Sequence, residues 1–331
     1  MEGYTWAFEF ENQLILWLQS LGQEGSFIYY FMQFFTLFGE EYILIGVIGL
    51  VYWGFNKQRG EQLALSVLAA NLTFPLVKNI VKRTRPFHSH PDILNLKDVE
   101  GYSFPSGHSS GSAATFVGTA MVMRDVKQKW LRKTLLGLAI AIPLLVALTR
   151  MYLGAHYLTD VVCGLAIGTG MVFLVNWLWN IVPNKMYIFY AILVIGLAGF
   201  FYCTTNDFYT AYGIMFGLTC GFLFEHKVVK FENTKTWWRI ALRLLGGGII
   251  YIGLNTVIKA IVGAIYPTFE DDFLFQRFFR TIRYAVIVFT AIGLYPMLFK
   301  PAEKLWKKLG WVKAPQDNQR WTSDSICQEH R

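Results

Sequence analysis

A series of long apolar blocks limits the fold of this chain more than any other feature. Nine such blocks follow one another with short connections between them: residues 40–55, 61–80, 108–124, 131–149, 157–182, 186–203, 207–224, 238–265 and 281–299. Apolar stretches of about 18 residues or more are typical of membrane-spanning helices. Only 16% of the residues are charged, against about 25% in soluble domains. We therefore predict an all-α, polytopic membrane helix bundle of about nine transmembrane helices.

Basic residues gather in every second connection between these blocks. Lys57 and Arg59 follow the first block, and further Lys and Arg residues follow the third, fifth, seventh and ninth blocks. Cytoplasmic connections are enriched in Lys and Arg, so we assign these connections and the C-terminus to the cytoplasm. Residues 81–107 and 150–156 then lie on the extracytoplasmic side. The same pattern accounts for the net charge of +8 without a nucleic-acid partner.

The first polar cluster is KNIVKRTRP, which contains Lys78, Arg85 and Pro86. Lys78 and Arg85 are two helical turns apart, and Pro86 biases Arg85 away from helical geometry, so Arg85 should lie on a loop at the membrane surface. Lysine offers a phosphate a point charge, and arginine offers it a planar fork. The alternative is a group of cations that snorkel from the end of a span, with Lys82 and Arg83 among them.

The second cluster is PSGH, from Pro105 to His108. Ser106 suits the N-cap of the helix that follows, and Gly107 allows a ligand close to the backbone. The first N–H groups of that helix would point at an anion, with His108 in the first turn. The alternative is an ordinary capped helix start with a solvated histidine.

The third cluster contains Arg150, His156 and Asp160. The spacing of four residues predicts that His156 and Asp160 share a helical face. A carboxylate beside an imidazole fixes the tautomer and makes the other ring nitrogen a better nucleophile. The alternative is a structural histidine–aspartate pair that caps a helix.

Taken together, the three clusters resemble the type-2 phosphatidic acid phosphatase superfamily, which includes membrane lipid phosphatases, glucose-6-phosphatase and the vanadium haloperoxidases. Its pattern is K-x6-R-P, then P-S-G-H, then S-R-x5-H-x3-D. The chain matches every spacing, with Thr149 in the place of the usual serine. The resemblance implies that His156 attacks phosphorus and forms a phosphohistidine, that Asp160 orients it, and that His108 protonates the leaving oxygen and later activates water.

The resemblance also implies which groups bind the phosphate oxygens: Lys78, Arg85, Ser106, the Gly107 N–H and Arg150. It implies no metal and no cofactor, because these cations would stabilise the charge of the transferred group.

The clusters suggest a division of the chain into four parts. Residues 1–25 would form an interfacial helix, 26–182 the phosphatase core, and 301–331 a polar cytoplasmic tail. Residues 183–300 would add transmembrane helices, which could form a lipid-entry groove, a partner site or a homo-oligomer interface.

We therefore predict a multi-pass phosphatase of the cell membrane that hydrolyses a lipid phosphate or pyrophosphate at the extracytoplasmic face. Candidate substrates are phosphatidic acid, phosphatidylglycerol phosphate and undecaprenyl pyrophosphate. Three alternatives stay open: a glucose-6-phosphatase-like enzyme with a soluble substrate, a phosphotransferase, and a non-catalytic lipid transporter or scaffold. The complete motif set argues against the last, because an inactive site has no need of His108 and His156.

Overall fold

The computed structural model describes residues 3–234, 236–266 and 272–302. The regular elements in these stretches are all helices. The predicted polar tail, 301–331, lies outside the described residues apart from its first two positions. The all-α class predicted from the apolar blocks is confirmed.

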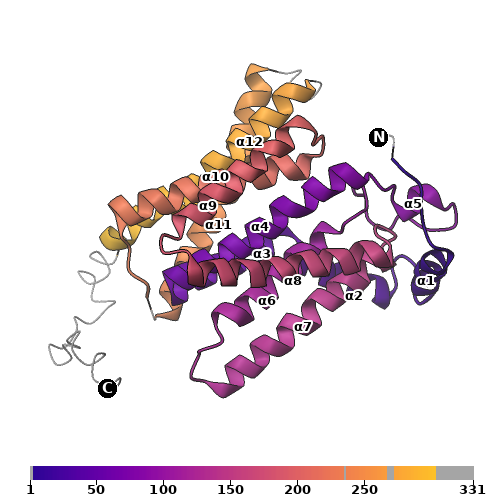
Figure 1. Cartoon of the computed structure of the whole chain (residues 1–331), viewed down its shortest axis with the longest axis horizontal. Coiled ribbons are helices and arrows are strands. Elements are labelled where there is room, and N and C mark those ends of the chain that lie inside the picture. The colour runs from indigo at the N-terminus through magenta and orange to yellow at the C-terminus, as the bar shows by residue number, and fades with distance from the viewer. Residues whose placement is uncertain (1–2, 235, 267–271, 303–331) are drawn as a thin grey trace.

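The described residues form twelve α-helices (Figure 1). Their bounds are α1 Glu9–Ser20, α2 Phe27–Thr36, α3 Glu41–Gly49, α4 Lys57–Val81, α5 Pro86–Ser89, α6 Gly107–Val122, α7 Lys129–Tyr152, α8 Leu158–Ile181, α9 Met186–Gly196, α10 Asn206–Phe224, α11 Trp237–Ile265 and α12 Phe273–Phe289. Tighter or wider helical turns extend α3 to Phe55, α9 to Phe201 and α12 to Leu298.

In the part of the chain that the structure describes, five helices are long and apolar enough to cross a membrane: α4, α7, α8, α11 and the continuous helix that begins with α12. The pair α2 and α3, which is bent by 51° where they join, makes a sixth candidate if it counts as one span. Helices α6, α9 and α10 also occupy predicted blocks, but they are too short or not apolar enough to count as candidate spans by themselves. The multi-pass membrane class stands, whereas the predicted count of nine spans is not confirmed.

The other helices pack around α4. It contacts α6 and α8 as well as α10, so it joins the two parts of the chain that the sequence divided near residue 182 (Figure 1). Leu63, Leu65 and Ala70 of α4 have no exposed surface. A helix that is buried on most sides belongs in the middle of a bundle.

Glycines allow two pairs of helices to approach closely. Gly164 and Gly168 of α8 face the backbone of α6, and a Cβ atom at Gly164 would lie 2.5 Å from the carbonyl oxygen of Ser106. Gly213 and Gly217 of α10 face the backbone of α12 in the same way. Small residues are typical of helix contacts in membranes, where close backbone packing replaces the hydrophobic driving force.

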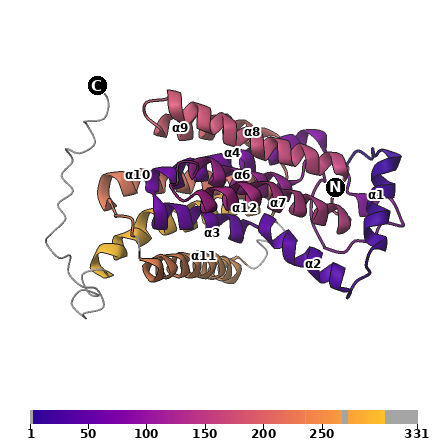
Figure 2. The ribbon, with the colours of Figure 1, turned by 90° about the horizontal axis from the view of Figure 1, so that it is seen from below.

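Helix α1 lies at one end of the bundle (Figure 2). It buries Ile15 and Leu18 in a cluster with Met151 and Tyr152 of α7. A helix was predicted in residues 1–25 and is present there. Its placement at a membrane surface stays a prediction.

Candidate active site

The three sequence clusters meet at one end of a large cavity of about 1020 Å³. They come from the end of α4 and the loop after it, the start of α6, and the connection between α7 and α8. Six of the eight predicted site residues line this cavity: Lys78, Arg85, Gly107, His108, Arg150 and His156. Ser106 and Asp160 are fully buried behind it.

Arg85 lies outside α4, as Pro86 predicts. The helix ends at Val81, and Arg85 has extended geometry at the start of the short helix α5. Its guanidinium donates to the carbonyl oxygens of Glu100 at 2.6 Å, Gly101 at 2.9 Å and Ala155 at 3.0 Å. Burial lowers the pKa of Arg85 to about 10, so the group stays charged at neutral pH. These bonds hold the guanidinium in place, and no carboxylate among the described residues forms an ion pair with it.

His156 is 2% exposed, and its two ring nitrogens face different partners. Nε2 lies 3.4 Å from the Arg85 guanidinium, and Nδ1 lies 3.6 Å from an Asp160 carboxylate oxygen. Burial lowers the pKa of His156 well below its ordinary value, and the nearby charges of Arg85, Arg150 and Lys78 lower it further. The imidazole is therefore neutral at neutral pH.

The relation between His156 and Asp160 differs from the predicted one. Helix α8 begins at Leu158, so His156 precedes it and the two residues do not share a helical face. Asp160 accepts a hydrogen bond from the Tyr157 N–H at 2.8 Å and so closes the first turn of α8. The distance of 3.6 Å to His156 exceeds that of a hydrogen bond. The capping interpretation thus describes Asp160 in this structure, while its carboxylate still lies next to the imidazole.

Arg83 is the main partner of Asp160, at 2.6 Å. It is fully buried, also pairs with Glu11 of α1 at 2.8 Å, and lies between the rings of Trp6 and Tyr157 at 3.8 Å from each centre. The interpretation of Arg83 as a snorkelling cation is wrong. Its charge instead joins α1, the loop after α4 and the start of α8.

Ser106 forms the predicted N-cap of α6. Its hydroxyl accepts hydrogen bonds from the N–H and the hydroxyl of Ser109, at 3.4 and 3.0 Å. At Gly107, a Cβ atom would lie 2.7 Å from the ring of Phe74, so only glycine fits this turn without a shift. The predicted helix start is confirmed, although the Ser106 side chain is engaged within it.

His108 lies in the first turn of α6 and faces Glu40. The distance from its Nε2 to a Glu40 carboxylate oxygen is 3.3 Å, and Lys97 reaches the same oxygen at 2.6 Å. The side chain of His108 is 24% exposed and lines the cavity. His108 is thus partly buried, with its ring against Glu40, instead of standing free in solvent.

Arg150 and Lys78 complete the group of cations. Arg150 is 1% exposed and donates to the Thr36 hydroxyl at 3.2 Å, while its Nε has no hydrogen-bond partner among the described residues. Lys78 pairs with Asp207 of α10 at 2.8 Å. A buried guanidinium with an unused donor beside a cavity is suited to an anion, because unpaired buried donors are costly.

Several of these partners were not predicted as site residues: Glu11, Glu40, Arg83 and Asp207. The sequence did offer one signal for such residues, because an ionisable residue next to or within an apolar block of a membrane protein is a functional candidate. This signal does not indicate which distant residue the ionisable group will contact. Glu40 and Glu41 interrupt the apolar run, and Asp207 opens another block.

The structure thus combines a membrane helix bundle with a cavity, and buried cations and two histidines lie at one end of this cavity. Such a group of residues is suited to bind an anion. Residues 61–187 match the PAP2 superfamily, and residues 209–305 match the transmembrane extension of PAP2 superfamily phosphatases. Together these stretches cover well over half of the chain. The chain belongs to the PAP2 superfamily, which confirms the resemblance in the motifs.

Curated relatives match only part of the chain. The undecaprenyl-diphosphatase of Sulfolobus acidocaldarius is 32% identical over 43% of this chain and 66% of that protein. Phosphatidylglycerophosphatase B of Bacillus subtilis is 31% identical over 40% of this chain and 64% of that protein. Sphingosine-1-phosphate phosphatase 2 of Mus musculus is 24% identical over 49% of this chain and 45% of that protein. The chain thus spans between about half and two thirds of the length of these relatives.

Among solved structures, the chain is similar to Aquifex aeolicus LpxE, with 22% identity, a TM-score of 0.42, and coverage of 51% of this chain and 96% of that chain.

Proposed function

We propose that this chain is an integral membrane phosphatase that hydrolyses a lipid phosphate or pyrophosphate monoester. One observation carries the proposal: a neutral, buried His156 lies beside Arg85 in a cavity that Lys78 and Arg150 also line. The matched relatives support it, because their names describe phosphatases of undecaprenyl pyrophosphate, phosphatidylglycerophosphate and sphingosine 1-phosphate.

In the first step, the Nε2 lone pair of His156 attacks phosphorus and the bond to the leaving oxygen breaks. Lys78, Arg85 and Arg150 bind the phosphoryl oxygens, whose charge is spread in the transition state. His108 gives its proton to the leaving oxygen. Burial and the charge of Arg150 lower the pKa of His108 to about 4, and Glu40, whose carboxylate lies 3.3 Å away, opposes this shift. We propose that the negative charge of the bound phosphate favours the imidazolium form further.

In the second step, neutral His108 takes a proton from water, which attacks the phosphohistidine. The bond between phosphorus and Nε2 breaks, and inorganic phosphate leaves. The His156 ring carries a positive charge while Nε2 is bonded to phosphorus, and it returns to neutral when this bond breaks. Asp160 stabilises the charged ring, and we expect the distance of 3.6 Å between them to shorten in the phosphohistidine. The cations supply the charge stabilisation, so we propose that turnover needs no metal.

We also propose that the site faces the extracytoplasmic side. The motif-bearing ends of α4, α6 and α8 lie at one end of the cavity, and the basic connections, such as the one with Lys57 and Arg59, lie at the other ends of these helices. The charge bias of membrane proteins favours the cytoplasm for the latter.

The test is phosphate release by the purified protein in detergent with EDTA. The panel contains phosphatidic acid, phosphatidylglycerol phosphate, undecaprenyl pyrophosphate and glucose 6-phosphate. We expect release from at least one lipid and none from the His156→Ala variant, with unchanged thermal stability as the control for folding. Release from glucose 6-phosphate alone, or from no substrate, would refute the proposal.

A further inference from the structure

The cavity that contains the candidate active site has a polar end and an apolar remainder. Most of its charged lining residues lie at helix ends or in the loops next to them: Glu40, Glu41, Lys78, Arg85, Glu100, Arg150 and Asp207. Arg280 of α12 also lines the cavity. Away from this end the lining is apolar, with Leu44 and Ile48 of α3, Leu68 of α4, Leu218 of α10 and Ile292 beyond α12. We call this apolar remainder the chamber.

The whole cavity, from its polar end to the far end of the chamber, is about as deep as one leaflet of a bilayer. On α4 the lining residues run from Lys78 to Val67, and on α10 they run from Asn206 to Leu218. At the rise of an α-helix these stretches span about 16 and 18 Å. Half of a bilayer's hydrocarbon core measures about 15 Å. A molecule with its phosphate at His156 would thus find an apolar space for a hydrocarbon chain across one leaflet.

Most of the outer wall comes from helices of the matched transmembrane extension, which the catalytic motifs do not explain. Helix α10 contributes Leu218, α11 contributes Leu244 and Tyr251, and α12 with its continuation contributes Val288 and Ile292. Without these helices, the inner wall formed by α3 and α4 would be open along its length.

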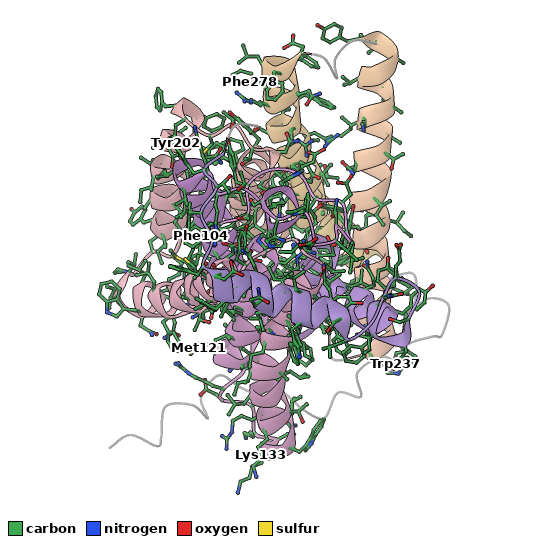
Figure 3. The ribbon with its side chains drawn as sticks, turned by 90° about the vertical axis from the view of Figure 1, so that its right-hand side faces the viewer. Phe104, Met121, Lys133, Tyr202, Trp237 and Phe278 are labelled. Carbon is green, nitrogen blue, oxygen red and sulfur yellow. The ribbon has the colours of Figure 1, made fainter. Side chains whose placement is uncertain are left out.

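The open side of the chamber lies between α3 and α11. Gly46 of α3 and Gly248 of α11 both line the cavity, and a Cβ atom at either position would have no neighbour within 4 Å. Only Arg243, Gly247 and Tyr251 of α11 are buried, so most of this helix faces outward. Figure 2 shows α11 as a separate rod beside α3, and Figure 3 shows it rising from Trp237 apart from the main bundle.

We propose that the chamber binds the hydrocarbon chain of the substrate and that the C-terminal helices thereby select lipid phosphates with a long chain. This inference rests on the proposed function. A hydrocarbon chain gains little free energy by moving from the bilayer into an equally apolar chamber. The chamber acts instead by holding the phosphate in line with Nε2 of His156, and such positioning raises the rate of reaction.

The first test narrows the chamber without disturbing the fold. The variant Gly248→Phe places a ring at the open side, and Gly253→Phe is the matched control. Gly253 lies on the same helix about 140° away, does not line the cavity and also has open space at its Cβ position. We expect Gly248→Phe to lower kcat/KM about tenfold for a long-chain phosphate and less than about twofold for a short-chain homologue. Gly253→Phe should change neither value.

The second test needs no turnover. A long-chain phosphate with a diazirine at the end of its chain is bound to the His156→Ala protein, irradiated, and the labelled peptides are identified. We expect labels at the deep end of the chamber, near Leu218 and Ile292, and competition by unlabelled long-chain phosphate.

The outcomes separate the two proposals. If the wild-type protein releases no phosphate while the His156→Ala protein is labelled in the chamber, the proposed function is refuted and the hydrocarbon-chain site is kept. Phosphate release with equal effects of Gly248→Phe on long and short chains, or labels only elsewhere, would overturn the chain site. A dimer whose interface closes the opening between α3 and α11 would overturn it as well.

Discussion

Adding one methyl group at Gly164 should disturb both the stability and the activity of the protein. Gly164 of α8 packs against the N-terminus of α6, where a Cβ atom would lie 2.5 Å from the Ser106 carbonyl oxygen and 3.1 Å from Ser109 Cβ. An ordinary contact needs about 3.4 Å, so the two helices must separate by about 0.9 Å. The obstacle is backbone and cannot rotate away.

Two effects of opposite sign set the magnitude for Gly164→Ala. Alanine favours the helix over glycine by about 0.5–1 kcal/mol, whereas overpacking costs about 1–3 kcal/mol. We expect a net loss of about 1–2 kcal/mol in the free energy of unfolding. The shift also moves His108 on α6 relative to Asp160 on α8, and a misplacement of about 1 Å costs about a hundredfold in rate.

The matched control is Gly170→Ala on the same helix, where a Cβ atom would meet nothing within 4 Å. This variant should be as stable as the wild type or slightly more stable, with unchanged turnover. Thermal unfolding in detergent, followed by tryptophan fluorescence, gives the stability, and phosphate release gives the rate. If Gly164→Ala matched Gly170→Ala in both measurements, the close approach of α6 and α8 would not constrain the site.

Three further predictions concern the charged groups. Arg83→Met leaves two buried carboxylates without their cation and should cost about 3–5 kcal/mol in denaturant unfolding, and an unchanged midpoint would contradict this. Asp207→Asn removes the carboxylate that pairs with Lys78, so inorganic phosphate and vanadate should inhibit more strongly, with lower inhibition constants. Unchanged or higher inhibition constants would argue against competition between Asp207 and the anion for Lys78. Burial and, after it, the nearby cations lower the pKa of His156, so the acid limb of kcat/KM should lie below pH 6.5. Arg85→Met should move this limb to higher pH even if it also slows turnover, and an unmoved limb would contradict the role of Arg85.

Local signals in the sequence predicted much of the site. The Ser106 N-cap, the extended Arg85 before Pro86 and the membrane helices themselves follow from residues close together in the chain. Such features depend on capping, proline geometry and apolar length, which act over a few residues. The spacing of the three motifs also indicated that Lys78, His108 and His156 would meet, and they line one cavity.

The number of spans could not be settled in the same way. Nine apolar blocks are visible, but helix α6 has only 16 residues and α2 meets α3 at a bend of 51°. Whether such pieces cross a membrane depends on the helices around them, because protein can cover a short or broken helix at membrane depth.

The apolar blocks, the helix ends and the motif residues were thus determined by the sequence alone, through interactions between near neighbours. The tertiary structure decided the pairings. Glu11 meets Arg83 from 72 positions away, and Lys78 meets Asp207 from 129 positions away. These contacts and the chamber exist because helices distant in the chain pack side by side, and no local pattern specifies which distant charge or apolar face a residue will meet.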